Sequence, residues 1–439
     1  MPRTSPLYRA GIFLARGLVP AAGTFAPKLK LGHAGRRTAL DLMQAWGDAS
    51  RDPDRPLLWL HAPSVGEGLQ ARAVLLELRS RHPDWQYAYT FFSPSAEALA
   101  STMPVDVSGY LPYDVRADVT AALRALRPNA LIFTKLDLWP ELACRARAEG
   151  CKVVLVAGTV RSGSSRLKWP ARALLAPGYR ALNAAGAVAR KDALRLSALG
   201  VPPERVSVTG DPRYDSVMER VRQTDSDDPL LELAEGGPLL VAGSTWPDDE
   251  AVLLPAFRRI RQEFPDARLI VAPHEPSQQH LAGVERSAAK LDLPEPVRLG
   301  EDRGPAPILL IDRLGVLATI YGAGHMAFVG GSMGSIGIHS VIEPAAWGIP
   351  VAFGPSWDYS RDAGELLRAG GASALGTEDP VADLVAVWRA WLLNDETRRA
   401  MGERALRVVQ DGVGAAERSA QLIDRVLLDD SAFDGDGSG

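Results

Sequence analysis

The sequence alternates short apolar runs with longer stretches of helical periodicity, and this alternation occurs in two separate blocks. In the first block, residues 57–62 (LLWLHA) and 87–92 (YAYTFF) flank a stretch of helical periodicity at 67–81. Such alternation is typical of βαβ units, in which helices cover both faces of a parallel sheet. The expected fold class is therefore α/β, with strands at 57–62, 87–92, 130–134, 152–157 and 205–209 in the first block and at 239–242, 268–272, 308–311, 326–329 and 350–353 in the second.

The length and the position of turn-rich segments predict how the chain divides. At 439 residues it is about three times the usual ~150 residues per domain. We expect two Rossmann-like, doubly wound domains that face a central cleft, because ligands bind at the carboxyl ends of the strands in such sheets. The predicted segments are a basic N-terminal segment and helix (1–50), a first domain (51–217), an acidic linker (218–237), a second domain with terminal helices (238–429) and a flexible tail (430–439).

Composition excludes several classes of protein. Hydrophobic residues make up 46% and charged residues 23% of the chain, which is ordinary for globular domains. The net charge of -4 argues against a general nucleic-acid-binding protein. The two cysteines, Cys144 and Cys151, are too few for a disulfide framework or a cysteine zinc site, and they fit a reducing, cytosolic environment.

The N-terminal segment differs in charge from the rest of the chain. Residues 1–50 contain seven basic and two acidic residues, giving +5, whereas the remainder carries -9. The apolar stretch at 7–25 is interrupted by Arg9, Arg16 and Pro20, so it is too short to span a bilayer. It fits a helix lying on a membrane surface, and equally a helix packed on the first domain.

A carboxylate follows the first predicted strand. Ser64, Gly66 and Glu67 lie at the start of the helix after residues 57–62, so Glu67 is expected at the carboxyl edge of the sheet. A carboxylate there can act as a general base on a hydroxyl group. The alternative is structural, because Ser64 followed by Glu67 fits a capping box.

A glycine-rich turn lies in the second block. Gly330, Gly331 and Ser332 open a loop that ends at His339, between the strand at 326–329 and a helix predicted through 341–347. Glycines let the backbone approach a ligand, and the helix N-terminus favours a phosphate. Glu343 is placed to accept hydrogen bonds from ribose hydroxyls. The alternative is a tight connection without a ligand.

Other strand ends offer weaker candidates. Ser244 and Thr245 precede an acidic stretch, which is typical of an ordinary helix start, although their hydroxyls can also meet a ligand. Asp137 and Arg213 follow strands of the first domain and are either ligand-binding groups or solvated loop charges. The pattern at 322–327 matches the letters of a dinucleotide fingerprint but precedes a strand, which argues against a dehydrogenase. His274 lacks the spacing of a helical zinc motif.

Taken in order, these pieces resemble the bacterial Kdo transferases, glycosyltransferase family 30, which have the GT-B fold of two facing Rossmann-like domains. The resemblance spans residues 57–370. It rests on the stretches WLHAPSVGEGLQA, YLPYD, TKLDLWPEL, VTGDPRYDSV, VAGSTWPDDE, VAPHEP, LIDRLGVLATIY and FVGGSMGSIGIHSVIEPAAWGIPVAFGP.

The resemblance implies a reaction and a cellular place. The reaction is transfer of 3-deoxy-D-manno-oct-2-ulosonic acid (Kdo) from CMP-Kdo to a lipid A precursor in lipopolysaccharide biosynthesis. It proceeds with inversion at the anomeric carbon and without a metal or other cofactor. The N-terminal segment would attach the protein to the cytoplasmic face of the inner membrane as a peripheral or monotopic protein.

The resemblance also assigns roles to residues. Glu67 would be the catalytic base, and Ser64, Gly66, Asp137 and Arg213 would lie on the acceptor side. The donor-binding residues would be Ser244, Thr245, His274, Leu314, Gly315, Gly330, Gly331, Ser332, His339, Ser340 and Glu343. The sequence departs from the family pattern in four places: it has Asp137 in place of Glu, Val316 in place of Glu and Ser340 in place of Asn, and it lacks the Arg of the usual Pro-Arg-His run at Pro273-His274.

Two other interpretations remain open at this stage. One is another GT-B enzyme, either a transferase that uses a different nucleotide sugar or a UDP-sugar epimerase. The other is a non-catalytic homologue that binds a sugar nucleotide without turnover.

Overall fold

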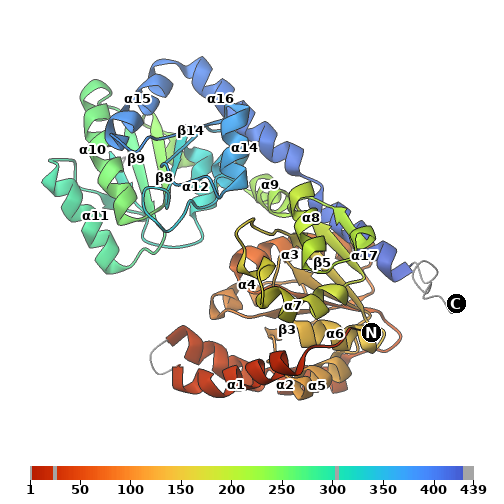
Figure 1. The fold of residues 1–439 in the computed structure, drawn as a ribbon. Coiled ribbons are helices and arrows are strands. Elements are labelled where there is room, and N and C mark those ends of the chain that lie inside the picture. Colours follow the sequence, from red (N-terminus) through yellow and green to blue (C-terminus); the bar gives the residue numbers. More distant parts are fainter. Residues whose placement is uncertain (1, 23–26, 302–305, 429–439) are drawn as a thin grey trace. The chain divides into compact units, whose positions relative to one another are not determined.

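The computed structural model describes residues 2–22, 27–301 and 306–428. The chain forms two compact units, each built around its own sheet (Figure 1). Unit 1 contains Met1–Ser216 together with Val413–Gly439, and unit 2 contains Val217–Gly412. The predicted tail at 430–439 lies outside the described residues.

In the described part of the chain, the sheet of unit 1 has seven strands, all parallel, in the order β3-β2-β1-β4-β5-β6-β7. The central strand β1 pairs on both sides, with Leu58 opposite Tyr87 and Ala130. The strands are β1 (Leu57–His61), β2 (Gln86–Phe91), β3 (Val107–Tyr110), β4 (Ala130–Thr134), β5 (Lys152–Gly158), β6 (Ala184–Ala187) and β7 (Val206–Val208).

Helices cover both faces of this sheet. Leu57 and Trp59 of β1 belong to one buried cluster, while Leu58 and Leu60 belong to the cluster on the opposite face. Successive residues of this apolar strand thus point to opposite faces, and both faces are buried, as expected for a parallel sheet covered by helices on both sides. The helices are α1 (Pro6–Ala22), α2 (Pro27–Ser50), α3 (Val65–Arg81), α4 (Glu97–Ala100), α5 (Arg116–Leu126), α6 (Pro140–Ala148), α7 (Ala171–Arg180), α8 (Arg190–Leu199), α9 (Arg213–Gln223), which continues into unit 2, and α17 (Ala415–Leu428).

Unit 2 repeats this plan. Within the described residues, its seven parallel strands follow the order β10-β11-β9-β8-β12-β13-β14. The strands are β8 (Leu239–Thr245), β9 (Arg268–Pro273), β10 (Val297–Arg298), β11 (Ile308–Leu310), β12 (Met326–Val329), β13 (Val351–Phe353) and β14 (Ala372–Ala374). The helices are α10 (Pro247–Glu263), α11 (Gln278–Lys290), α12 (Leu317–Ala323), α13 (Ile342–Ala346), α14 (Arg361–Ala369), α15 (Pro380–Leu393) and α16 (Asp395–Gly412).

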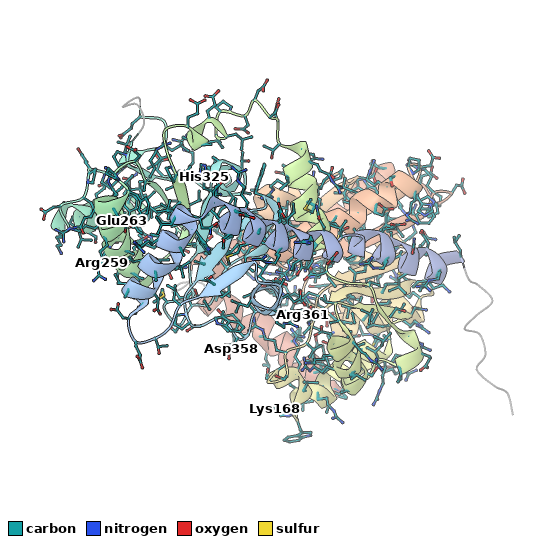
Figure 2. All side chains as sticks on the ribbon, turned by 90° about the horizontal axis from the view of Figure 1, so that it is seen from above. Lys168, Arg259, Glu263, His325, Asp358 and Arg361 are labelled. Atoms are coloured by element: carbon teal, nitrogen blue, oxygen red, sulfur yellow. The ribbon has the colours of Figure 1, made fainter. Side chains whose placement is uncertain are left out.

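Helix α10 is an example of the amphipathic helices that cover the sheet, with one buried apolar face and one exposed polar face. Leu253 and Phe257 are buried against the sheet, while Arg259 and Glu263 point outward (Figure 2). This amphipathic pattern orients the helix on its sheet. The two α/β units with parallel sheets confirm the predicted fold class.

The last helix is the main correction to the predicted domain boundaries. We expected residues 238–429 to form one domain, but α17 packs on α3, β5 and β6 of unit 1. Ala420, Leu422 and Ile423 of α17 are buried in the core of that unit. Asp215 accepts hydrogen bonds from the backbone N–H groups of Gly414 (2.7 Å) and Ala416 (3.1 Å), so it fixes the start of α17. The chain therefore enters unit 2 near residue 217 and returns near residue 412.

The N-terminal helix is attached to unit 1 but exposes apolar side chains. The Tyr8 hydroxyl donates to the Asp114 carboxylate at 2.7 Å, which ties α1 to the body of the unit. Its exposed apolar side chains have between 64% and 70% of their surface accessible; they are Leu7, Phe13, Leu14 and Leu18. Over the described ranges, no helix combines the length and the hydropathy that crossing a bilayer requires.

Candidate active site

In both sheets the order of the strands reverses beside the first strand, β1 in unit 1 and β8 in unit 2. The predicted site residues lie near these two strands. In unit 1 the chain passes from β1 outward to β2 and β3, then returns to place β4 on the other side of β1. In unit 2, β8 and β12 have the same relation. The loops that leave two such strands diverge, which opens a crevice at the carboxyl edge where ligands bind. Ser64 and Glu67 follow β1, Ser244 is the last but one residue of β8, and Gly330 follows β12.

In unit 1, Glu67 forms a salt bridge rather than a helix cap. Its Oε1 lies 2.6 Å from Nζ of Lys135, which directly follows β4. The Ser64 hydroxyl donates to the other carboxylate oxygen. Ser64 makes no side-chain hydrogen bond to the helix backbone, so the capping-box alternative is wrong. Gly66 lies in the first turn with open space around its Cα.

The neighbours of Glu67 determine its charge. Burial raises the pKa of Glu67, but the Lys135 ammonium group and the Ser64 hydroxyl outweigh burial, so this pKa lies below its ordinary value. The Glu67 side chain is 16% exposed and the Lys135 side chain is 46% exposed. Glu67 is thus an ionised carboxylate at the edge of the sheet.

Asp137 lies two residues after Lys135 and contacts different groups. Its Oδ2 is 2.9 Å from Nε2 of the fully buried His61 and accepts from the Trp139 indole at 3.1 Å. Burial raises the pKa of Asp137, yet the contacts with His61 and Trp139 lower it below its usual range. The shorter carboxylate at this position is therefore held in a defined orientation next to the Glu67 loop.

Arg213 is held by a neighbouring carboxylate. Its guanidinium contacts Asp211 at 2.7 Å, and Asp211 also accepts from Nε2 of Gln70 in α3 at 2.9 Å. The loop after β7 thereby reaches the helix that carries Glu67. The same loop anchors α17, because Arg418 donates to the carbonyl of Thr209 at 2.9 Å.

In unit 2, internal hydrogen bonds hold the carboxyl end of β8 and the turn that follows it. Ser244 has a φ of +53° and interrupts the register of β8 with β9. The buried Thr245 hydroxyl donates to Glu250 at 2.9 Å, and the same Glu250 oxygen lies 2.9 Å from His280. Thr245 therefore orients this turn, and its hydroxyl already has a partner.

The glycine turn after β12 is organised by Asp249. This buried carboxylate accepts from the backbone N–H groups of Trp246 (2.9 Å), Gly331 (2.8 Å) and Met333 (3.3 Å). Burial raises the pKa of Asp249 and these three bonds lower it, with a net rise. A Cβ on Gly330 would lie 2.4 Å from the Ser244 carbonyl oxygen, so only glycine fits there.

This arrangement corrects the predicted phosphate site. We expected the turn and the following helix to offer free N–H groups, but Asp249 binds two of those groups and α13 is only five residues long. Ser332 is also structural, because its buried hydroxyl accepts from the N–H of Gly354 at 2.6 Å.

Two predicted histidines stack beside this turn, together with a tryptophan. The rings of His274 and His339 are 4.1 Å apart and nearly parallel, and Trp246 lies 5.2 Å from His274. The Trp246 indole N–H donates to Nε2 of His339 at 2.9 Å. Burial, with His274 nearby, lowers the pKa of His339 to about 4, so the ring is neutral and carries its hydrogen on Nδ1.

The remaining predicted donor residues lie in the segments that follow β11 and β12. Leu314 is 74% exposed, and Gly315 has a φ of +91° with open space around it. These two residues follow β11. Ser340 follows His339 directly, and Glu343 is in the first turn of α13.

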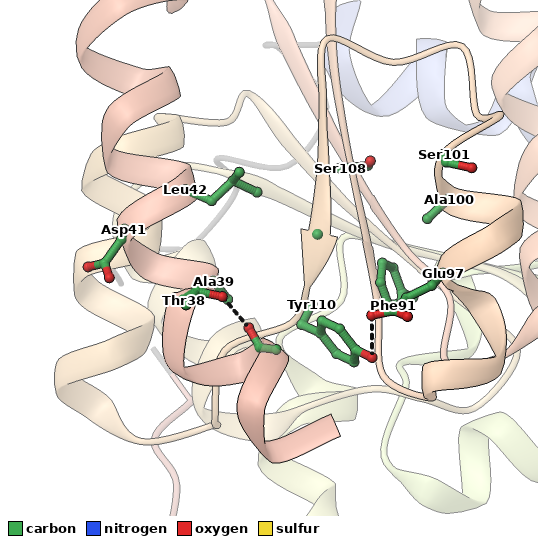
Figure 3. Close-up of a pocket in the computed structure, with 12 residues that line it drawn as sticks. Thr38, Ala39, Asp41, Leu42, Phe91, Glu97, Ala100, Ser101, Ser108 and Tyr110 are labelled. Carbon is green, nitrogen blue, oxygen red and sulfur yellow. Dashed lines mark hydrogen bonds between the residues drawn. The ribbon is translucent and has the colours of Figure 1, made fainter. Parts of the chain in front are cut away.

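Unit 1 contains a cavity of about 540 Å³ between α2, α4 and β3 (Figure 3). The Tyr110 hydroxyl donates to Glu97 at 2.9 Å on one side of it. None of the predicted site residues lines this cavity. Within the described ranges, no cluster of three His, Cys, Asp or Glu side chains has the arrangement of a metal site.

Four residues at the two sites were not predicted: Lys135, His61, Trp246 and Asp249. His61 ends β1 and Lys135 directly follows β4. Their position at strand ends, which was the reason for predicting Glu67 and Asp137, could also have identified these two residues. Asp249 was interpreted as part of an acidic first helical turn, and only the fold brings it to the glycine turn 82 positions later.

Comparison with known proteins agrees with these observations. Residues 37–216 match a family model described as 3-deoxy-D-manno-octulosonic-acid transferase (kdotransferase). Over 387 residues, the chain is 25% identical to the 3-deoxy-D-manno-octulosonic acid transferase of Haemophilus influenzae, covering 86% of this chain and 88% of that protein. It is 28% identical over 331 residues to the protein of the same name from Chlamydophila psittaci, covering 72% and 73%.

Solved structures agree on the fold. The UDP-GlcNAc 2-epimerase from Neisseria meningitidis bound to UDP-GlcNAc has a TM-score of 0.61 and 14% identity, with 85% of this chain and 99% of that chain covered. At this identity the likeness concerns the fold alone. The sequence matches and the two Rossmann-like units together indicate a glycosyltransferase with the GT-B fold whose sequence is similar to the Kdo transferases.

Proposed function

We propose that this enzyme transfers Kdo from CMP-Kdo to a lipid A precursor in lipopolysaccharide biosynthesis, with inversion and without a metal ion. The observation that carries the proposal is the position of Glu67. It is an ionised and mostly buried carboxylate beside β1, where the strand order of the unit 1 sheet reverses. The relatives named above support Kdo as the transferred sugar.

In the proposed reaction, Glu67 accepts the proton of an acceptor hydroxyl. The hydroxyl oxygen forms the new bond to the anomeric carbon, and the bond from that carbon to the CMP phosphate breaks. The phosphate oxygen leaves with the electron pair. Because a single new bond forms as the old one breaks on the opposite face, the anomeric configuration inverts. A positioned base of this type typically contributes 100-fold to 10,000-fold to the rate.

On the donor side, unit 2 supplies a neutral imidazole and an exposed segment after β11. The Nδ1–H of His339, fixed by Trp246, can donate to an acidic group of the donor. The exposed Leu314 and the adjoining Gly315 offer a surface for the nucleobase. CMP carries one phosphate and is a good leaving group, so hydrogen bonds can stabilise it without a divalent ion.

The proposal also places the enzyme on the cytoplasmic face of the inner membrane through its N-terminal segment. The exposed apolar side chains of α1 and the basic charge of residues 1–50 support a surface contact with anionic lipid. Replacing Phe13, Leu14 and Leu18 by serine should shift the protein from the membrane fraction to the soluble fraction. The control is Leu428→Ser on α17, which removes a side chain that is equally exposed.

The transfer assay tests the proposed function. Purified protein is incubated with CMP-Kdo and a lipid A precursor, with and without EDTA, and the lipid is analysed by mass spectrometry. The expected result is a gain of Kdo mass that survives EDTA, with CMP released. Absence of transfer, or transfer from a UDP-sugar alone, would overturn the proposal.

A further inference from the structure

Lys135 is the only partner of Glu67 in the described structure that carries a positive charge. The pair joins the loops that leave two adjacent strands, β1 and β4, so it sits in the predicted acceptor site. Lys135 has a φ of +64°, a conformation disfavoured for a residue with a Cβ, yet its N–H still donates to the Val156 carbonyl at 2.8 Å. The chain thus keeps a lysine in a strained position beside the base.

The ion pair opposes the role proposed for Glu67. When the carboxylate accepts a proton it becomes neutral, and the attraction to the ammonium group is lost. The other groups near Glu67 do not offset this effect: Ser64 donates a hydrogen bond to it, and the buried Tyr89 of β2 is a neutral phenol. A base that is paired in this way reacts only if the lysine can leave.

The geometry allows Lys135 to leave. Its side chain is nearly half exposed and consists of a flexible stem, whereas Glu67 is mostly buried and also held by Ser64. The mobile member of the pair is therefore the cation. An anionic group that enters the site from solvent can take the ammonium group as a new partner, and a phosphate is the strongest such partner among common sugar substituents.

We propose that Lys135 is a positioning residue that holds Glu67 in an ion pair until an anionic substituent of the acceptor, such as a sugar phosphate, binds the ammonium group and frees the carboxylate. This inference rests on the proposed function of Glu67 as the base. It adds a substrate requirement: the acceptor must carry an anion close to the hydroxyl that reacts. Proton transfer to Glu67 is then coupled to correct acceptor binding.

The test compares two acceptors and three enzymes. The acceptors are a phosphorylated lipid A precursor and the same lipid after phosphatase treatment, and the enzymes are wild type, Lys135→Met and Lys135→Arg. We expect wild type to prefer the phosphorylated acceptor in kcat/KM by at least about tenfold. Lys135→Met should reduce this preference to less than about threefold, and Lys135→Arg should retain most of it. The control is Lys290→Met, which removes an exposed lysine from α11 of unit 2.

The pH profile gives a second readout. Loss of Lys135 removes a group that lowers the pKa of Glu67, so the acid limb of kcat/KM should move to higher pH in Lys135→Met. A side chain that only supports the fold would not produce this shift. An unchanged preference for the phosphorylated acceptor in Lys135→Met, at an unchanged Tm, would overturn the inference.

Acceptor binding without donor separates this inference from the proposed function. In Glu67→Gln, the lysine loses its charged partner, so the phosphorylated lipid should bind several-fold more tightly than to wild type, although transfer is lost. If wild type shows no Kdo transfer at all, the proposed function fails. The role of Lys135 can still be tested in that case. If wild type binds the phosphorylated and the dephosphorylated lipid equally well, and Lys135→Met does the same, then Lys135 is not the anion partner.

Discussion

The carboxyl edges of the two sheets hold their polar groups in different ways. In unit 1, charged side chains pair with each other, either between loops, as in Glu67 with Lys135, or within one segment, as in Asp211 with Arg213. In unit 2, the buried carboxylates of Asp249 and Glu250 bind backbone N–H groups, a hydroxyl or an imidazole, and three rings stack. Paired charges at a partly exposed edge can exchange partners and protons, whereas a turn fixed by backbone bonds is preorganised for binding. The comparison suggests chemistry on unit 1 and donor binding on unit 2.

The largest expected effect is a loss of kcat without a change in donor binding, which would separate the proposed chemistry on unit 1 from donor binding on unit 2. Glu67→Gln removes the proposed base while keeping the shape of the side chain, so kcat should fall by about 100-fold to 10,000-fold. The KM for CMP-Kdo should change less than about twofold, because the proposed donor site belongs to unit 2. Steady-state kinetics at saturating acceptor measure both values. A kcat within threefold of wild type would contradict the assignment of the base.

A second prediction concerns how α17 supports unit 1. Ile423 is fully buried against that unit, so Ile423→Ala should lower the free energy of unfolding by about 2–5 kcal/mol. If the units unfold in separate calorimetric transitions, only the transition of unit 1 should move. The matched control is Leu428→Ala, at an exposed position of the same helix. A shift confined to the transition of unit 2 would show that the helix belongs there.

Asp249 tests the preorganised turn of unit 2. Asp249→Ala leaves three backbone N–H groups without their acceptor, so the KM for CMP-Kdo should rise by about 10-fold to 100-fold. Asp249→Asn keeps an acceptor oxygen and should show a smaller rise. Thermal unfolding checks that both variants fold. Equal donor KM values in wild type, Asp249→Ala and Asp249→Asn would show that this turn does not contribute to donor binding.

The smallest expected effect concerns the imidazole of His339. Trp246→Phe keeps an aromatic ring but removes the hydrogen bond that fixes the tautomer, so the donor KM should rise about threefold to tenfold. Because the pKa of His339 is about 4, wild type should show no titration of this ring between pH 6 and 8. Nitrogen-15 NMR of the labelled ring reports both the tautomer and the pKa. A protonated ring at pH 7 would contradict this account.

Much of the fold was predictable because the strands at the centre of each sheet are long and continuously apolar. All ten predicted strands are present, whereas four short strands were missed. Two of these show why. The sequence of β6 is AAGA, where small residues are needed because a Cβ on Gly186 would meet Thr209 and Leu422 of α17. The strand β14 is ASA, three residues long at the sheet edge.

The site was predictable only in part, for a related reason. Position after a strand pointed to Glu67, Asp137 and His339, since parallel strands bring their carboxyl ends together. Which partner each side chain takes depends on contacts between distant segments. The pairing of Glu67 with Lys135 spans 68 positions, and that of Trp246 with His339 spans 93. A local pattern such as Ser64 and Glu67 therefore predicted a helix cap where the fold provides a stronger partner.

The division of tasks between the two units is tested most directly by hydrogen–deuterium exchange of the whole protein with and without CMP. The account predicts slower exchange at residues 244–249 and 330–340 of unit 2 when CMP is present, with no change at 61–67 and 134–139 of unit 1. Protection confined to the unit 1 segments, with the unit 2 loops unaffected, would contradict it.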